Sequence, residues 1–370
     1  MQNNIMSHGQ EEPLAPNTQN LHQGYVELYH HGFFHIKSTA LLCAVGLGIP
    51  SAIHRRGGAA KASDLVAETG VHPAKLPYLR RLMRALAASG IFAAAHQPDD
   101  DDDGGGENVY TARSPRYMSA LLRLLARPST AVSPFFSLEA CLRDGGAATL
   151  FEMAHGVPPW SLTKDDASYN EAMNDACAVD SGFSMDAMLQ EVGVTDIFRG
   201  LSSLVDVGGG HGAAAMAIAR AFPNVKRCTV LDLEQVISEA PAAGTVDDGT
   251  VQFVAGDMFE SIPPADAVFL RHVLDCWDDD QCVTILRQCK RAIPTRDAGG
   301  KVIIVNVVVG HGPQDNVVKE TQVLFDMYMM RYGGAEREEH EWKKIFLEAG
   351  FNDYKITPIL GFQSIIEVFP

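Results

Sequence analysis

The sequence predicts an α/β protein in which a doubly wound parallel sheet follows a mostly helical domain. Apolar, strand-like runs alternate with helical stretches after Gly200, and a glycine-rich turn follows the first of these runs. A helix-turn-helix pattern followed by two short strands comes earlier in the chain. The length of 370 residues exceeds the size of a usual single core, so two domains are expected.

The composition is that of a globular protein, with 46% hydrophobic and 21% charged residues. Thirty Lys and Arg against 46 Asp and Glu give a net charge of -16, which repels phosphate backbones and anionic lipid. We therefore expect no nucleic-acid partner and no membrane partner. Residues 1–20 lack an apolar signal region, which favours a cytoplasmic location. The seven cysteines form no CxxC pair and are expected to be reduced, without a metal site.

The first elements predict a winged-helix layout over residues 21–118, after a disordered tail at 1–20. A helical pattern begins near Leu21, and the apolar stretch Ala40–Ile49 is expected to be buried all round, as in a subunit interface. Ser63 is expected to cap a short helix that ends at Gly70.

A second helix and a two-stranded wing follow. The spacing of apolar residues predicts a helix over Leu76–Ala88, and strands are expected at Ile91–Ala95 and Val109–Ala112. The loop between the strands carries the acidic run Asp99–Asp103. A DNA-reading wing would place Lys or Arg there, so DNA binding is disfavoured.

Residues 119–370 predict the sheet domain. The expected strands are Ser203–Val207, Thr229–Leu231, Val251–Val254, Ala267–Phe269 and Val302–Val309. In sheets of this kind, ligands bind just outside the carboxyl ends of the strands.

Three strand ends carry signals for a nucleoside-like ligand. The turn Gly208–Gly212 leaves bare backbone for a ligand, although a dinucleotide loop or a plain tight turn would look similar. Asp232 can accept hydrogen bonds from both ribose hydroxyls, or could cap a helix. Asp257 could accept from an adenine amino group, with Met258 on the ring. Together they favour S-adenosylmethionine over a dinucleotide, because no pyrophosphate needs the helix terminus.

Over residues 20–370 the sequence resembles the plant small-molecule O-methyltransferases of the caffeic acid and flavonoid type, most closely the grass members. The resemblance is carried by LVDVGGGHG, TVLDL, FVAGDMFESIPPADAVFL, CWDDDQCVTILRQCKRAIP, GGKVII, GGAEREEHEWKKIFLEAGF and YKITPILGFQSIIEVFP. It implies a Rossmann-like, S-adenosylmethionine-dependent methyltransferase domain. It also implies an N-terminal, mostly helical, winged-helix-like dimerisation domain and an obligate homodimer acting on a small aromatic substrate.

The resemblance also implies a set of cofactor-binding positions. Arg271 stands where the family has a Lys that faces the cofactor. The other positions are Ser181, Gly208, Asp232, Asp257 and Met258.

Two of the three catalytic positions depart from the family pattern LKW-x-LHDW. The matching stretch reads LRHVLDCW, so Asp275 replaces the general-base His, and Asn306 replaces the carboxylate that orients it. Glu336 is retained. His272, at the family's Trp position, is a candidate for a displaced base, but it is expected to point elsewhere.

An Asp with an ordinary pKa of ~3.9 is a poor base for a phenol with a pKa of ~10. Three hypotheses follow. The acceptor could be an amine, a thiol or an acidic oxygen that needs little help. Alternatively, burial beside Glu336 raises the pKa of Asp275 so that it serves as the base. A third possibility is a protein that binds the cofactor without transferring methyl groups.

The acceptor pocket is predicted from the resemblance. Cys177 replaces one Met that clamps the acceptor ring, and Met327 falls at the other clamp position. Trp160 is expected to form a wall, and Arg331 to pair with Glu336 or with an acidic substrate. Further expected walls are Phe183, Met330 and Tyr332.

Overall fold

The computed structural model describes residues 18–98, 106–112, 119–146, 148–191, 193–240 and 250–370. The chain divides into two compact units, Met1–Tyr117 and Met118–Pro370, where the sequence predicts a boundary at 118/119. The tail expected at 1–20 lies almost wholly outside the described residues, as does the acidic loop.

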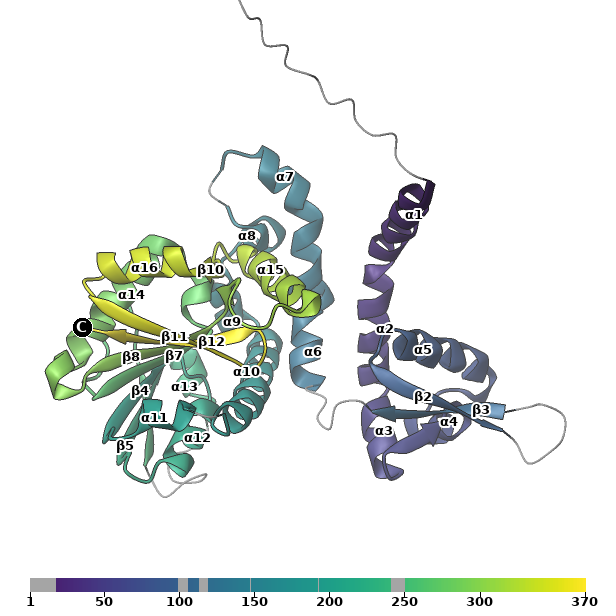
Figure 1. Ribbon diagram of the computed structural model, residues 1–370, viewed down its shortest axis with the longest axis horizontal. Helices are drawn as coiled ribbons and strands as arrows, with labels where there is room; N and C mark the ends of the chain where they lie inside the picture. Colours follow the sequence, from purple (N-terminus) through teal and green to yellow (C-terminus); the bar gives the residue numbers. More distant parts are fainter. Residues whose placement is uncertain (1–17, 99–105, 113–118, 147, 192, 241–249) are drawn as a thin grey trace, which may run out of the picture. The chain divides into compact units, whose positions relative to one another are not determined.

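The first unit contains the predicted helix-turn-helix and wing (Figure 1). Its three-stranded antiparallel sheet has the order β1-β3-β2. The three-residue strand β1 was not predicted from the sequence. The elements are α1 (Thr18–Gly32), α2 (Phe34–Gly46), α3 (Ile49–Arg55), β1 (Ala59–Lys61), α4 (Ala62–Thr69), α5 (Leu76–Ala88), β2 (Phe92–Pro98) and β3 (Gly106–Ala112).

One expectation for this unit is wrong, and a second one stays a prediction. Ser63 does not cap α4: the Asp64 carboxylate accepts from the Lys61 N–H at 3.0 Å, while the Ser63 hydroxyl donates to Glu107 at 2.6 Å. The all-round burial expected for Ala40–Ile49 in a subunit interface is not tested by a single chain, in which one side of this stretch packs on the core and Cys43 is exposed.

Helix α1 and the start of α2 expose many apolar side chains in the single chain. The exposed apolar residues are Leu21, Tyr25, Val26, Leu28, Tyr29, Phe33 and Ile36.

Among the described residues no single helix is long and apolar enough to cross a membrane. Helices α2 and α3 are long and apolar enough only when taken together, and the pair is bent by 50°.

The second unit opens with helices and continues as alternating strands and helices. The helices that precede the sheet are α6 (Ser119–Leu125), α7 (Leu138–Arg143), α8 (Leu150–His155), α9 (Pro159–Asp165), α10 (Ala167–Met188) and α11 (Val194–Phe198). They are followed by β4 (Ser203–Val207), α12 (Ala213–Ala221), β5 (Arg227–Asp232), α13 (Glu234–Ile237), β6 (Val251–Ala255), β7 (Ala267–Arg271), α14 (Asp279–Ala292), β8 (Lys301–Asn306), β9 (Val308–Val309), α15 (Asn316–Met330), β10 (Arg337–Glu338), α16 (Glu339–Glu348), β11 (Asp353–Ile359) and β12 (Gln363–Phe369).

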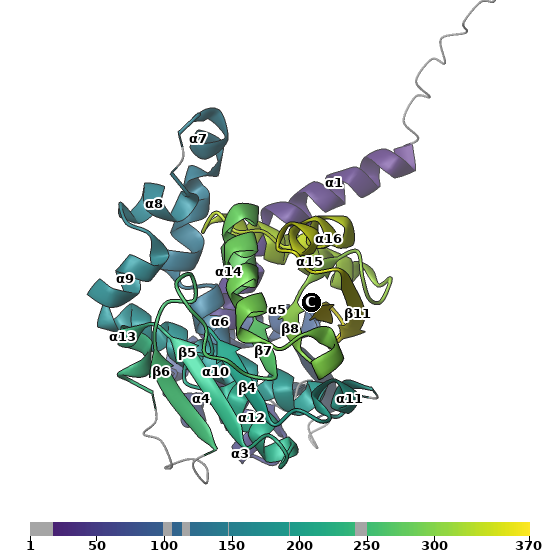
Figure 2. The same ribbon diagram turned by 90° about the vertical axis from the view of Figure 1, so that its left-hand side faces the viewer.

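The main sheet has seven strands in the order β11-β12-β8-β7-β4-β5-β6. Strands β8, β7, β4, β5 and β6 are parallel, whereas β12 runs antiparallel to β8 and β11, so the sheet is mixed at one edge. Helices α14 and α16 cover one face, and α10, α11 and α12 cover the other (Figures 1 and 2). The α/β fold is confirmed.

The strand predicted over Val302–Val309 is divided in the structure. β8 ends at Asn306, and β9 leaves the sheet to pair with β10. Because the central strands are parallel, Asn306 shares one edge of the sheet with Val207, Asp232 and Arg271, which end their own strands. The candidate site lies at this edge.

Candidate active site

The glycine turn after β4 brings bare backbone to the sheet edge. Gly208 is exposed and has φ 65°, and a Cβ there would lie 2.9 Å from a methyl group of Val273. At Gly209 a Cβ would lie 2.6 Å from the Asp206 carboxyl group. Neither position accommodates a larger residue without rearrangement, so the turn presents its backbone closely to a ligand.

Asp232 at the end of β5 is held by two backbone groups. Its Oδ2 accepts from the Gly210 N–H at 2.8 Å, and its Oδ1 accepts from the Leu233 N–H at 2.7 Å. Burial raises the pKa of this carboxyl group. Each oxygen retains a further lone pair, which suits two ribose hydroxyls. The alternative role as a helix cap is not seen, because the capping residue of α13 is Leu233.

The turn after β6 is fixed to its neighbour. The Gly256 N–H donates to the Asp232 carbonyl oxygen at 2.9 Å. Exposed Asp257 accepts from the Phe259 N–H at 2.8 Å, and Met258 packs against the core. An exposed carboxylate beside a half-buried thioether is consistent with adenine contacts.

Arg271 at the end of β7 joins the sheet to α10. Its guanidinium group donates to the Ser181 hydroxyl at 3.0 Å and to the Asp180 carboxylate at 2.5 Å. Its Nε is buried and has no hydrogen-bond partner within the described residues. An orphaned cationic donor suits a ligand carboxylate, so this set of residues fits S-adenosylmethionine, whose amino-acid moiety ends in one.

A buried polar cluster lies beside these residues. Asp275, in the turn after β7, is 1% exposed, Asn306 is fully buried, and Glu336 is 5% exposed. His272 Nδ1 lies 3.1 Å from Asp275 Oδ2. Donor atoms of His272, Asp275 and Glu336 lie within 4.8 Å of one another. The same atoms could bind a metal ion, and the absence of a metal stays a prediction.

The expectation that His272 points elsewhere is wrong. The residue has φ 50°, in the left-handed region, and its N–H donates to the Val305 carbonyl oxygen at 3.0 Å. The chain therefore turns sharply at the end of β7, and the imidazole is directed toward Asp275. A positive φ at a non-glycine residue is not readable from the sequence.

The two acids of the cluster differ in charge. Burial by itself would raise the pKa of Asp275, but the hydrogen bond and charge of His272 hold that pKa below its ordinary value. Burial, followed by the Asp275 charge, raises the pKa of Glu336 well above the usual range. Asp275 is therefore ionised and Glu336 protonated at neutral pH. The hypothesis that Asp275 has a raised pKa is contradicted.

Asn306 lies against both acids. Its amide interacts favourably with the charged forms of Asp275 and Glu336, although the contacts are looser than full hydrogen bonds. Because the amide is neutral, it adds polarity to the cluster without adding a third acid.

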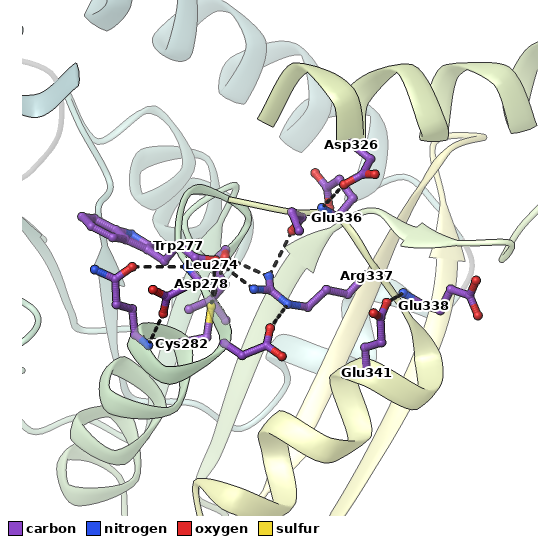
Figure 3. Close-up of polar contacts among 12 residues, drawn as sticks. Leu274, Trp277, Asp278, Cys282, Asp326, Glu336, Arg337, Glu338 and Glu341 are labelled. Carbon is purple, nitrogen blue, oxygen red and sulfur yellow. Dashed lines mark hydrogen bonds and ion pairs between the residues drawn. The ribbon is translucent and has the colours of Figure 1, made fainter. Parts of the chain in front are cut away.

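Gly334 and Arg337, on either side of Glu336, fix the cluster in place, and the sequence did not reveal their role. Buried Arg337 donates to the carbonyl oxygens of Leu274 at 3.2 Å and Trp277 at 2.8 Å (Figure 3). A Cβ at Gly334 would lie 1.9 Å from the Asp275 carbonyl oxygen. The segment carrying Glu336 is thus in direct contact with the turn carrying Asp275.

Aromatic side chains pack next to this turn. The Trp160 ring centroid lies 6.1 Å from that of Trp277 and 5.9 Å from that of Tyr332. Met327 is 38% exposed. Cys177 is exposed at the surface, yet desolvation by the surrounding protein raises the pKa of its thiol to about 11, so the thiol is neutral.

Arg331 is engaged away from Glu336. Its guanidinium carbon lies 3.7 Å from the Tyr328 ring centroid and 4.0 Å from that of Tyr332. Its Nη1 donates to the Thr130 carbonyl oxygen at 2.7 Å. The predicted pairing with Glu336 is absent from the hydrogen bonds and ion pairs of the described residues, and these contacts indicate a packing role.

The fold, and the residues at the strand ends that fit S-adenosylmethionine, are those of an S-adenosylmethionine-dependent methyltransferase. The O-methyltransferase domain family matches residues 135–352, and the O-methyltransferase dimerisation domain family matches residues 29–119. The chain belongs to the O-methyltransferase family, as the resemblance indicated.

Full-length relatives agree with this assignment, and a solved structure shares the fold. The chain is 51% identical to acetylserotonin O-methyltransferase 3 of Oryza sativa subsp. japonica, over 98% of both proteins. It is 46% identical to 5-pentadecatrienyl resorcinol O-methyltransferase of Sorghum bicolor, over 96% of this chain and 99% of that one. Human N-acetylserotonin methyltransferase in complex with SAM shares the fold, with a TM-score of 0.75 and 18% identity, over 98% and 99% of the two chains.

Proposed function

We propose that the protein transfers the methyl group of S-adenosylmethionine to a hydroxyl oxygen of a small aromatic acceptor. The observation that carries the proposal is the buried cluster of His272, Asp275 and Glu336, at the same sheet edge as Asp232 and Arg271. The acceptors in the names of the relatives, acetylserotonin and a resorcinol, support an oxygen acceptor.

Each group of residues has a distinct task in this reaction. Asp232 binds the ribose, and Arg271 binds the carboxylate of the cofactor. When bound, S-adenosylmethionine supplies an electrophilic methyl group on a sulfonium sulfur. Trp160 and Tyr332 offer flat surfaces to an aromatic ring. The polar cluster receives the proton that the acceptor loses.

A panel of acceptors tests the proposal, because the sequence left amines, thiols and acidic oxygens open. Turnover with S-adenosylmethionine is measured for matched phenols, anilines and thiophenols, together with the dissociation constant of the cofactor. We expect turnover of phenols. Exclusive methylation of amines or thiols contradicts the oxygen acceptor. Tight cofactor binding without any turnover favours the non-methylating alternative.

The exposed apolar side chains of α1 and the dimerisation-domain match support a homodimer. Sedimentation of Leu28→Glu tests it, with Leu142→Glu as the control because the two leucines are similarly exposed, at 73% and 75%. We expect only the first variant to dissociate. A monomeric wild type contradicts the homodimer. The cytoplasmic location is also a proposal, and imaging of a tagged chain tests it.

A further inference from the structure

We infer that His272 is the general base of this enzyme and that Asp275 is the positioning residue that holds it. The inference rests on the proposed function and assigns its proton-transfer step. The family pattern has a His, the general base, at position 275. This chain has Asp275 there, and its imidazole stands three residues earlier, at His272.

The geometry of the pair suits this division of roles. His272 Nδ1 faces Asp275 Oδ2 at 3.1 Å, and a carboxylate there requires the proton on Nδ1. The lone pair is then on Nε2, which no described residue engages in a hydrogen bond. The His272 side chain is 15% exposed and that of Asp275 is 1% exposed. An acceptor can therefore reach the imidazole but not the carboxylate.

Neighbouring elements restrain the imidazole. The Phe325 ring of α15 meets it edge-on, with centroids 5.3 Å apart and planes at 66°. Helix α15 also carries Met327, predicted to clamp the acceptor, two residues after Phe325 in the chain. The left-handed backbone of His272 is a strained conformation of a kind that clusters at functional sites.

The charges around His272 suit a residue that accepts a proton. The groups facing it are Asp275 on its own turn and Glu336 before β10, and the amide of Asn306 on β8 lies against these two acids. Ionised Asp275 stabilises an imidazolium, while protonated Glu336 adds no second negative charge. A neutral imidazole is also a far better acceptor for a phenolic proton than an ionised Asp.

The step balances without another reactant. The acceptor O–H proton moves to His272 Nε2 as the oxygen attacks the methyl carbon. An O–C bond forms, the C–S bond of the sulfonium breaks, and its electron pair stays on the sulfur of S-adenosylhomocysteine. After the products leave, Nε2 releases the proton to solvent, which regenerates the neutral base.

Kinetics of full-length variants test the inference. We expect His272→Ala to lower kcat about 10²–10⁴-fold with little change in KM for the cofactor, and added imidazole to restore part of the rate. The pH profile of the rate should also differ between the wild type and the variant, because the variant lacks the group that accepts the proton. Equal rates and pH profiles for the variant and the wild type overturn the inference.

A matched control shows whether the loss of kcat in His272→Ala is specific to this histidine or follows the loss of any His–carboxylate pair. His311 Nε2 contacts Glu339 Oε2 at 3.0 Å outside the cluster. His311→Gln should keep the wild-type rate and pH profile. Asp275→Asn should lower kcat while retaining cofactor binding. Full activity of Asp275→Asn contradicts the positioning role.

Nitrogen-15 NMR of the histidines gives a readout that does not depend on turnover. The inference requires the Nδ1–H tautomer for neutral His272, assigned by comparison with His272→Ala, and Asp275→Asn should change its signals. An Nε2–H tautomer overturns the inference. If the wild type methylates no hydroxyl acceptor, the proposed function fails and so does the base assignment, whereas the NMR result still shows whether the pair exists.

Discussion

The close contact between Gly334 and the turn at Asp275 gives a sharp prediction for Gly334→Ala. The added Cβ would lie 1.9 Å from the Asp275 carbonyl oxygen and 2.7 Å from the Cys276 carbonyl carbon. Both neighbours are backbone atoms, so they cannot move aside as a flexible side chain can. The segment carrying Glu336 must shift away from the turn.

The shift has consequences for stability and for catalysis. Overpacking of this kind costs about 1–3 kcal/mol of folding free energy. For a unit of this size, each kcal/mol lowers Tm by about 2–4 °C. A displacement of about 1 Å at catalytic groups can cost 10²-fold in rate. Cofactor affinity should persist, because Asp232 and the glycine turn lie on β5 and after β4.

Calorimetry, thermal unfolding and steady-state kinetics check these expectations together. The control is Gly145→Ala, since a Cβ there meets nothing within 4 Å and the residue has no positive φ. We expect a reduced Tm, a kcat about 10²-fold lower and an unchanged cofactor dissociation constant for Gly334→Ala alone. A variant with wild-type kcat and Tm would refute the contact between the two segments.

Three further predictions concern the cofactor, a buried acid and the transposed pair. Asp232→Ala should weaken cofactor binding by about 1.5–3 kcal/mol in calorimetry, the value of hydrogen bonds to a charged group. An unchanged dissociation constant removes Asp232 from the site. Burial, and then the Asp232 charge, raises the pKa of Asp206 to about 7. Between ~3.9 and about 7 the native state binds one more proton than the unfolded chain, so stability should fall as pH rises. Asp206→Asn should flatten that fall in urea unfolding, and an unchanged slope contradicts the assignment. The combination His272→Trp, Asp275→His and Asn306→Asp, which restores the family pattern, should methylate phenols faster than His272→Trp alone; equal rates contradict this expectation.

The sequence predicted the strand ends because glycines and acidic residues directly follow buried apolar runs. Asp232 and Gly208 could be assigned in this way, since each signal is local. The contacts of Arg337 and Gly334 could not, because they join segments about 60 residues apart in the chain. The all-round burial predicted for Ala40–Ile49 stays a prediction, because hydrophobicity indicates that a surface needs cover, but not which chain supplies it.

His272 illustrates a limit of position-by-position comparison. At the family's Trp position, three residues before Asp275, the sequence predicts an imidazole that points elsewhere. The structure places φ 50° there and brings the ring to Asp275. One dihedral angle thus decides whether the chain contains a base at this edge of the sheet.

The substitution at 306 follows from the charges of the cluster. Asp275 is ionised beside His272, and Glu336 is held neutral by burial and by that charge. A carboxylate at 306, in the family's arrangement, would stand beside a neutral or cationic imidazole at 275. Here it would face an ionised Asp275 inside the protein, where like charges at short range are strongly unfavourable. Asn306 keeps the polar contact and avoids the repulsion. The three substitutions at 272, 275 and 306 are therefore coupled, and each is physically consistent only in the presence of the other two.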